Sequence, residues 1–176
     1  MENIFRGMLL VFFNFNLDID SMRIGLIPTF IGYIFIANGL SELTGFSSYF
    51  SKIAPYVKGM TVYAGICYVM DLLGISSALG MPISFVLGLI STIMSLLISY
   101  SIVMGIKDIE VMRGQNLNSE RLYSTWKLLA IFSLIVFLLY IIPVLAFICM
   151  IVGFFISVYY LYVFHETKTL FYENAQ

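Results

Sequence analysis

The chain has 176 residues, of which 61% are hydrophobic and 11% are charged, and its formal net charge is −1. Soluble domains carry roughly twice that share of charged residues, so the composition indicates a single membrane-embedded domain over residues 1–176. The near-neutral charge argues against nucleic acid as a partner, because a phosphate backbone requires a concentrated basic surface.

The first apolar segment, Ile4–Leu17, is short for a membrane span, because as a helix it would be roughly 21 Å long. We expect an interfacial or half-inserted helix here, with a true span as the alternative. Polar and apolar side chains then alternate through Asp20, and this period of two predicts an extended connector. No small-residue cleavage site follows the segment, so we expect it to remain on the mature protein.

Longer apolar segments follow this connector. The first, Ile24–Ser41, has eighteen residues without a charge, roughly 27 Å as a helix and close to the hydrocarbon thickness of a bilayer. The last, Leu128–Phe164, has 37 uncharged residues and would be about 55 Å long as one helix, so it must fold back near Pro143. We therefore expect an all-α integral membrane helix bundle with five transmembrane helices, at about residues 24–41, 56–73, 82–106, 122–140 and 143–164.

Proline placement supports these boundaries. A proline at the first helical position loses no hydrogen bond, because that N–H has no intrahelical partner. All four prolines fall at the start of an expected helix: Pro28, Pro55, Pro82 and Pro143.

The distribution of positive charge predicts the orientation. With five spans, Arg6 and Arg23 lie on one side of the membrane. The other side holds seven cations: Lys52, Lys58, Lys107, Arg113, Arg121, Lys127 and Lys168. The positive-inside rule makes this second side cytoplasmic, so we expect a cell-membrane protein with its N-terminus outside and its C-terminus inside. If Ile4–Leu17 spans instead, Arg6 moves to the cytoplasmic side and the later helices keep their orientation.

The third expected span carries small residues at steps of three and four, which share one helical face. These residues are Ser84, Gly88, Ser91, Ser95 and Ser99. Helices in lipid associate through small residues that let their backbones approach, so the pattern predicts a helix-packing seam. A hydroxyl-lined path for a solute is the alternative reading.

Two groups of polar residues are candidate sites. Asp71 is the only acidic residue within an expected span, about one turn from its outer end. It either reaches headgroup water or forms an intramembrane polar site with Asn38 for an ion or proton. Asp18 and Asp20 in the outer connector would attract cations, although the connector lacks the glycine and glutamate of an EF-hand calcium loop.

No catalytic constellation is recognisable. The chain has one histidine, His165, which we expect to complement the dipole at a helix C-terminus. Cys67 and Cys149 lie inside apolar segments and are read as small hydrophobic residues. No triad, metal-ligand spacing or phosphate-binding loop is present, so we expect no catalytic residue, no metal and no cofactor.

The segment Ile27-Pro28-Thr29-Phe30-Ile31-Gly32-Tyr33 resembles a group of uncharacterised small bacterial multi-pass membrane proteins that read Leu-Pro-Asp-Phe-Ile-Gly-Tyr there. The resemblance extends over about the first third of the chain, including Gly39 and Leu40. It implies membrane topology and no particular activity. This chain has Thr29 where the group has aspartate, so a function of that acid would be lost or altered here.

We expect a non-enzymatic integral membrane protein that serves as an accessory subunit of a membrane assembly. Its partners would be the lipid bilayer and other membrane protein subunits. The alternative is a small solute-binding or permease component of a transporter, similar in size to energy-coupling-factor substrate-binding subunits. A water-accessible cavity lined by Asp71, Asn38 and the hydroxyls of the third span would favour that alternative.

Overall fold

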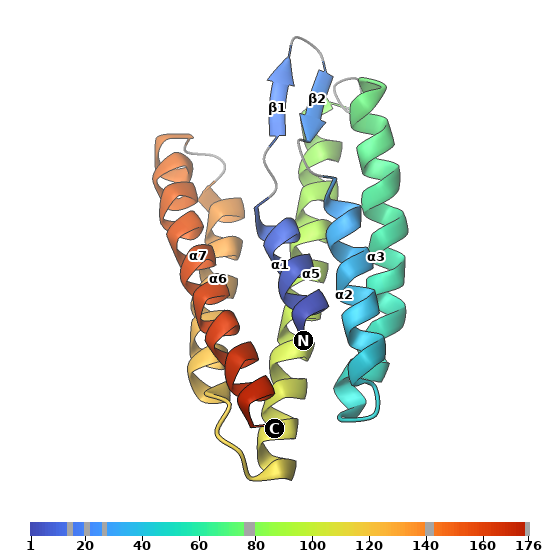
Figure 1. The fold of residues 1–176 in the computed structure, drawn as a ribbon. Coiled ribbons are helices and arrows are strands. Elements are labelled where there is room, and N and C mark those ends of the chain that lie inside the picture. Colours follow the sequence, from blue (N-terminus) through green and yellow to red (C-terminus); the bar gives the residue numbers. More distant parts are fainter. Residues whose placement is uncertain (14–15, 20–21, 26–27, 76–79, 140–142, 175–176) are drawn as a thin grey trace. The chain divides into compact units, whose positions relative to one another are not determined.

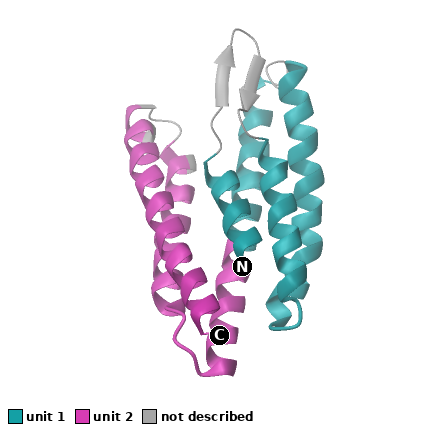
Figure 2. Cartoon of the chain, viewed as in Figure 1, with its two compact units in different colours: residues 1–98 teal, residues 99–176 magenta. Residues whose placement is uncertain are grey.

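A computed structural model describes residues 1–13, 16–19, 22–25, 28–75, 80–139 and 143–174. These residues are helical apart from one β-hairpin and the connections, which confirms the expected all-α class (Figure 1). In chain order the elements are α1 (Glu2–Phe12), β1 (Asn16–Ile19), β2 (Met22–Gly25), α2 (Thr29–Leu43), α3 (Ser48–Leu72), α5 (Gly80–Arg113), α6 (Ser119–Leu138) and α7 (Pro143–Glu173). The chain forms two compact units, residues 1–98 and 99–176, whose boundary lies within α5 (Figure 2).

Two helices are long and apolar enough to cross a membrane, in a search restricted to the described residues. They are Pro82–Arg113 in α5, with a mean hydropathy of 2.1, and Phe147–Glu173 in α7, with a mean hydropathy of 2.2. In the most apolar 18-residue stretch of each helix, only 28% (α5) and 22% (α7) is buried within the protein. Most of this apolar surface therefore faces something other than the chain itself, as in a membrane helix rather than a core helix of a soluble domain.

The extended connector is confirmed, and it is longer than expected. β1 and β2 pair antiparallel, with Leu17 opposite Ile24 and Asp18 opposite Arg23. A helix starting at Ile24 is therefore wrong, and α2 begins at Thr29. Pro28 occupies the N-cap with an extended backbone, and proline disfavours a helical conformation in the residue before it, so the helix does not extend further upstream.

The expected start of the second span at Pro55 is also wrong. α3 begins at Ser48, where the Ser47 side chain accepts a hydrogen bond from the Tyr49 N–H at 3.3 Å. Pro55 lies inside the helix and is exposed. The cap and a continuous buried face outweigh the hydrogen bond that the proline removes. That face is formed by Phe50, Ile53, Val57 and Met60, at steps of three and four.

The other two helix starts follow the proline pattern. Pro143 is the first residue of α7. Pro82 is the third residue of α5, in the turn where backbone N–H groups have no intrahelical partner. The break in the long apolar segment is confirmed, because one helix ends at Leu138 and the next begins at Pro143. The last helix is longer than expected, since α7 continues past residue 164 to Glu173.

In unit 1, α1 packs along α2 with the two helices antiparallel. Ile4 packs directly against Gly39, and the backbone of Gly7 packs directly against that of Gly32. Asn3 Nδ2 donates a hydrogen bond to Glu42 Oε1 at 2.6 Å, so the start of α1 lies at the same end of unit 1 as the end of α2. The five-span expectation put these two points on opposite sides of the membrane, and this part of it is wrong. Glycines at the α1–α2 contact allow the close packing that holds the two ends together.

In unit 2, α6 and α7 form an antiparallel hairpin that packs with the second part of α5. The buried apolar side chains concentrate near the α5–α6 connection and the end of α7. They include Ile102, Ile106 and Ile109 of α5, Leu122 and Leu129 of α6, and Tyr160 and Phe164 of α7. The first half of α7 is instead mostly exposed, including Phe147 at 59% and Phe155 at 66%.

Candidate functional site

Asp71 and Asn38 do not form a common site. Asp71 is half-buried near the end of α3, within one turn of the helix terminus as expected. Phe30 of α2 and Tyr68 of α3 are in ring contact, with centroids 5.7 Å apart. Because α2 and α3 are antiparallel, that contact places Asn38 roughly 16 Å from Asp71 along the helix axes. Asn38 is also exposed.

The outer connector is placed only in part. Asp18 lies in β1, opposite Arg23 in the register of the hairpin. Asp20 falls outside the described residues. The role of this connector in attracting cations stays a prediction.

The residues of the expected seam differ in their surroundings along α5. Ser84 is exposed, whereas Gly88 and Ser91 are half-buried. Within unit 1, Ser95 forms a side-chain hydrogen bond with Tyr33 of α2. Within unit 2, Ser99 is buried and its Oγ accepts a hydrogen bond from Trp126 Nε1 of α6 at 3.0 Å. The last two positions thus have polar partners on other helices, while a packing seam along the whole face stays a prediction.

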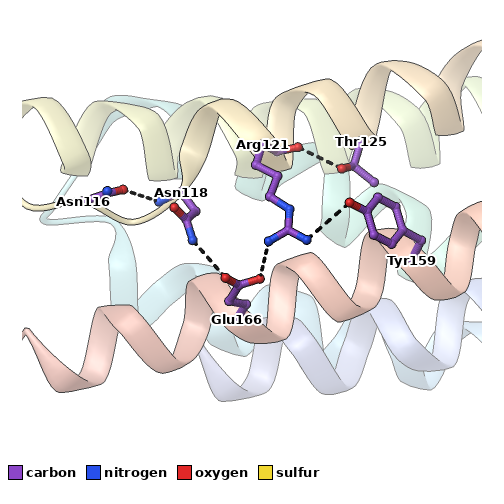
Figure 3. Close-up of polar contacts among 6 residues, drawn as sticks. All are labelled: Asn116, Asn118, Arg121, Thr125, Tyr159 and Glu166. Carbon is purple, nitrogen blue, oxygen red and sulfur yellow. Dashed lines mark hydrogen bonds and ion pairs between the residues drawn. The ribbon is translucent and has the colours of Figure 1, made fainter.

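The densest polar cluster of the described chain lies in unit 2, where the start of α6 meets the end of α7. We call it the α6–α7 clasp, formed by Asn118, Arg121, Tyr159 and Glu166 (Figure 3). Glu166 accepts hydrogen bonds from Asn118 Nδ2 at 3.1 Å and from Arg121 Nη1 at 2.8 Å. Arg121 Nη2 also donates to the Tyr159 hydroxyl at 3.4 Å, and its guanidinium lies 5.9 Å from the centre of that ring. The two oxygens of one carboxylate therefore tie the first turn of α6 to α7.

A second carboxylate holds the connection before α6. Glu110 Oε2 of α5 accepts backbone hydrogen bonds from Leu117 at 3.0 Å and from Ser119 at 2.9 Å. Asn118 between them has a φ of +57°, a left-handed conformation that asparagine tolerates better than most residues. Glu110 thus supplies from another helix the anion that a helix N-terminus favours.

Aromatic and cationic side chains gather on the neighbouring face of α6. The rings of Tyr100 and Trp126 lie 4.9 Å apart, and Tyr123 stacks with Trp126 at 6.1 Å. The Lys107 and Lys127 ammonium nitrogens lie 5.8 Å and 4.9 Å from the centre of the Tyr123 ring. We call these five residues the interfacial cluster, because aromatic and cationic side chains of this kind collect at membrane–water boundaries.

Ion pairs around the two clusters shift the acid–base equilibria of their members. The hydrogen bond to Glu120, followed by the charge of that carboxylate, raises the pKa of Lys107. The same hydrogen bond and the Lys107 charge lower the pKa of Glu120. The hydrogen bond to Tyr159 and the charge of Glu166 raise the pKa of Arg121. All three side chains therefore stay charged across the physiological pH range.

The clasp and the capping by Glu110 are structural arrangements rather than an obvious reaction centre. Their polar atoms bond to one another or to backbone groups. Among the described residues, no group of three or more histidine, cysteine, aspartate or glutamate side chains is placed to hold a metal ion. Comparison of the chain with protein-family models, curated proteins and solved structures gives no match.

Sequence reasoning missed the glycine contacts of α1 and the carboxylates of unit 2. Gly32 and Gly39 are seven residues apart and so share a helical face, a signal that was available. The pairing of Glu110 with Ser119 was not available, because it depends on how the chain turns between α5 and α6.

Proposed function

We propose that the protein is a multi-pass integral membrane protein with five transmembrane helices, α2, α3, α5, α6 and α7. α1, which packs antiparallel on α2, makes a further crossing before the outer connector. The observation that carries this proposal is the exposure of α5 and α7. More than two thirds of the most apolar stretch of each helix is not covered by the rest of the chain. Monomeric soluble domains rarely expose a contiguous apolar surface of this size to water. At roughly 22 Å α2 is short for a span, a mismatch that local thinning of the bilayer accommodates.

The packing of α1 on α2 supports one orientation of this topology. Because Asn3 bonds to Glu42, the start of α1 belongs to the same side of the membrane as the α2–α3 connection. Arg6 then joins the seven cations of that side and Arg23 alone remains opposite. The positive-inside rule makes the side with eight cations cytoplasmic, so the start of α1 and the end of α7 are both cytoplasmic.

Within this topology we propose a non-enzymatic role as an accessory subunit of a membrane assembly. The polar side chains that the described structure brings together stabilise helix ends, as in the α6–α7 clasp. The first half of α7 exposes aromatic side chains, among them Phe147 and Phe155. Helices in lipid associate by packing rather than by a hydrophobic driving force, so this uncovered surface is available to a partner helix as well as to lipid. The separation of Asp71 from Asn38 removes the main motive for a permease site. Kinship with the small bacterial membrane proteins named above remains part of the proposal.

Site-specific photocrosslinking from α7 tests the accessory role. A photoreactive amino acid replaces Phe155 on α7 or, as a control, Val62 on α3, which is 62% exposed. The proposal expects one membrane protein to crosslink from position 155 in intact membranes, in high yield, as expected for a stable complex. The same protein should not crosslink from position 62. Crosslinks to lipid alone from both positions would contradict it. A small molecule that co-purifies in stoichiometric amount would favour the transporter alternative.

A further inference from the structure

The interfacial cluster contains two lysines, of which only Lys107 forms an ion pair among the described residues. Lys107 and Lys127 both approach the Tyr123 ring, so their ammonium nitrogens are no more than about 11 Å apart. Glu120 forms an ion pair with Lys107. The Glu110 carboxylate accepts the backbone hydrogen bonds of Leu117 and Ser119. The charges of Glu110 and Glu120 both act on Lys107, and the charge of Lys127 acts on Glu120. Lys127 itself forms no ion pair within the part of the chain that the structure describes, so it is the cation placed to attract a further anion.

The aromatic rings of the interfacial cluster are held in place by packing and by a hydrogen bond. Trp126 Nε1 donates to Ser99 Oγ at 3.0 Å, and Ser99 is only 2% exposed. Tyr100 and Tyr123 pack on Trp126. The two lysine side chains therefore extend from adjoining helices over rings whose positions are set by packing and by a hydrogen bond. Such a preorganised site loses less conformational entropy when it binds a ligand.

A row of exposed apolar side chains continues from the cluster along α6. Ile131, Leu134 and Leu138 follow Lys127 at steps of four, three and four, which places all four on one helical face. Their exposed fractions are 54%, 42% and 76%. A cation at one end of an apolar row is complementary to an anionic lipid: the cation matches the headgroup and the apolar row matches an acyl chain.

We propose that the interfacial cluster binds the phosphate of an anionic phospholipid, with Lys127 as the main contact, Lys107 as the second and the row on α6 against an acyl chain. This proposal rests on the membrane topology proposed above, which places Lys107 and Lys127 together at the cytoplasmic boundary. The apolar row favours a lipid phosphate over free inorganic phosphate, because only a lipid contacts both the lysines and the apolar row.

Lipid binding to purified protein tests the proposal. Native mass spectrometry and thermal melting in a neutral detergent compare phosphatidylglycerol, phosphatidylcholine and inorganic phosphate. We expect phosphatidylglycerol to bind more tightly than phosphatidylcholine, and Lys127→Gln to weaken that binding about fivefold, the effect of about one cation near an anionic surface. Lys127→Arg should retain binding. Lys58→Gln, an exposed lysine of α3, is the matched control and should bind as the parent does.

The outcomes separate this proposal from the topology on which it rests. Equal binding of phosphatidylglycerol by Lys127→Gln and by the parent would overturn the lipid site and leave the membrane topology intact. Inorganic phosphate that binds as well as the lipid would also overturn it, since the ligand would then be a free anion. Protein that stays dispersed and folded without detergent would instead contradict the proposed topology itself.

Discussion

A Cβ atom on Gly7 would lie 2.5 Å from the carbonyl oxygen of Gly32, so the backbones of α1 and α2 are in direct contact. A Cβ on Gly32 would in turn lie 2.9 Å from the carbonyl oxygen of Gly7. Real Cβ atoms do not approach backbone oxygen this closely, and a backbone cannot move aside as a flexible side chain can. Together with the contact of Ile4 at Gly39, this contact holds the start of α1 beside the end of α2, on which the proposed topology depends.

Gly7→Ala should therefore destabilise the protein. Forcing the two helices apart costs about 1–3 kcal/mol, as other overpacked contacts do. Gly59→Ala is the matched control, because a Cβ there meets nothing within 4 Å and alanine favours a helix. Thermal melting in detergent should show a lower Tm for Gly7→Ala and an equal or higher Tm for Gly59→Ala. Equal losses in both would show that the α1–α2 contact is not tight.

Removal of the Glu110 carboxylate should loosen the connection between α5 and α6. Glu110→Ala leaves the backbone N–H groups of Leu117 and Ser119 without their acceptor, and both residues are almost fully buried. The expected cost is about 1–2 kcal/mol, similar to the loss of a helix cap. Glu173→Ala, at the exposed end of α7, should leave the Tm unchanged. Amide hydrogen exchange of residues 117–122 should rise in Glu110→Ala alone, and unchanged exchange would argue against the capping role.

The ion pair between Lys107 and Glu120 predicts a defined pH dependence. Because the pKa of Glu120 is lowered from 4.5 by folding, the pair stabilises the protein above that pH and loses its effect as the pH falls through the folded pKa. Because the pKa of Lys107 is raised from 10.5, the contribution is complete below that pH and is lost at higher pH. The Tm difference between the parent and Glu120→Gln should be constant from about pH 6 to about pH 9 and shrink below pH 4.5. A difference that instead grows toward acid pH would contradict this assignment.

Ser95→Leu tests the packing seam on α5. Ser95 is half-buried and bonds to Tyr33, so a larger apolar side chain loses that bond and overfills the contact. The expected loss is about 1–3 kcal/mol. Ile93→Leu, on an exposed part of the same helix, should be nearly silent. Identical melting of the two variants in detergent would show that this face of α5 is not a helix contact.

The sequence predicted the helical class and the starts of α5 and α7 to within two residues, because these depend on local features. The alternation of polar and apolar residues through Asp20 predicted the extended connector, and Pro143 predicted the break in the last apolar segment. The start of α3 was missed because the Ser47 cap and a buried face outweigh Pro55. The cap is a local signal, whereas the buried face is a tertiary effect, since it forms by packing against other elements such as α2.

The candidate sites were less predictable than the elements. Asp71 stood out as the one acid in an expected span, yet its position relative to Asn38 depends on the antiparallel packing of α2 and α3. The clasp formed by Arg121 and Glu166 joins residues 45 positions apart, so neither charge had a visible partner in the sequence.

The side of the membrane on which each connection lies tests the central claim most directly. Single cysteines replace Glu2, Thr44, Ile75 or Gly114 in a background lacking Cys67 and Cys149, and a membrane-impermeant maleimide is added to intact and to permeabilised cells. The account predicts that the Ile75→Cys variant reacts in intact cells. Glu2→Cys, Thr44→Cys and Gly114→Cys should react only after permeabilisation, since the start of α1 lies at the Glu42 end of unit 1. Labelling of Glu2→Cys in intact cells while Thr44→Cys stays protected would contradict the packing of α1 on α2 and the topology built on it.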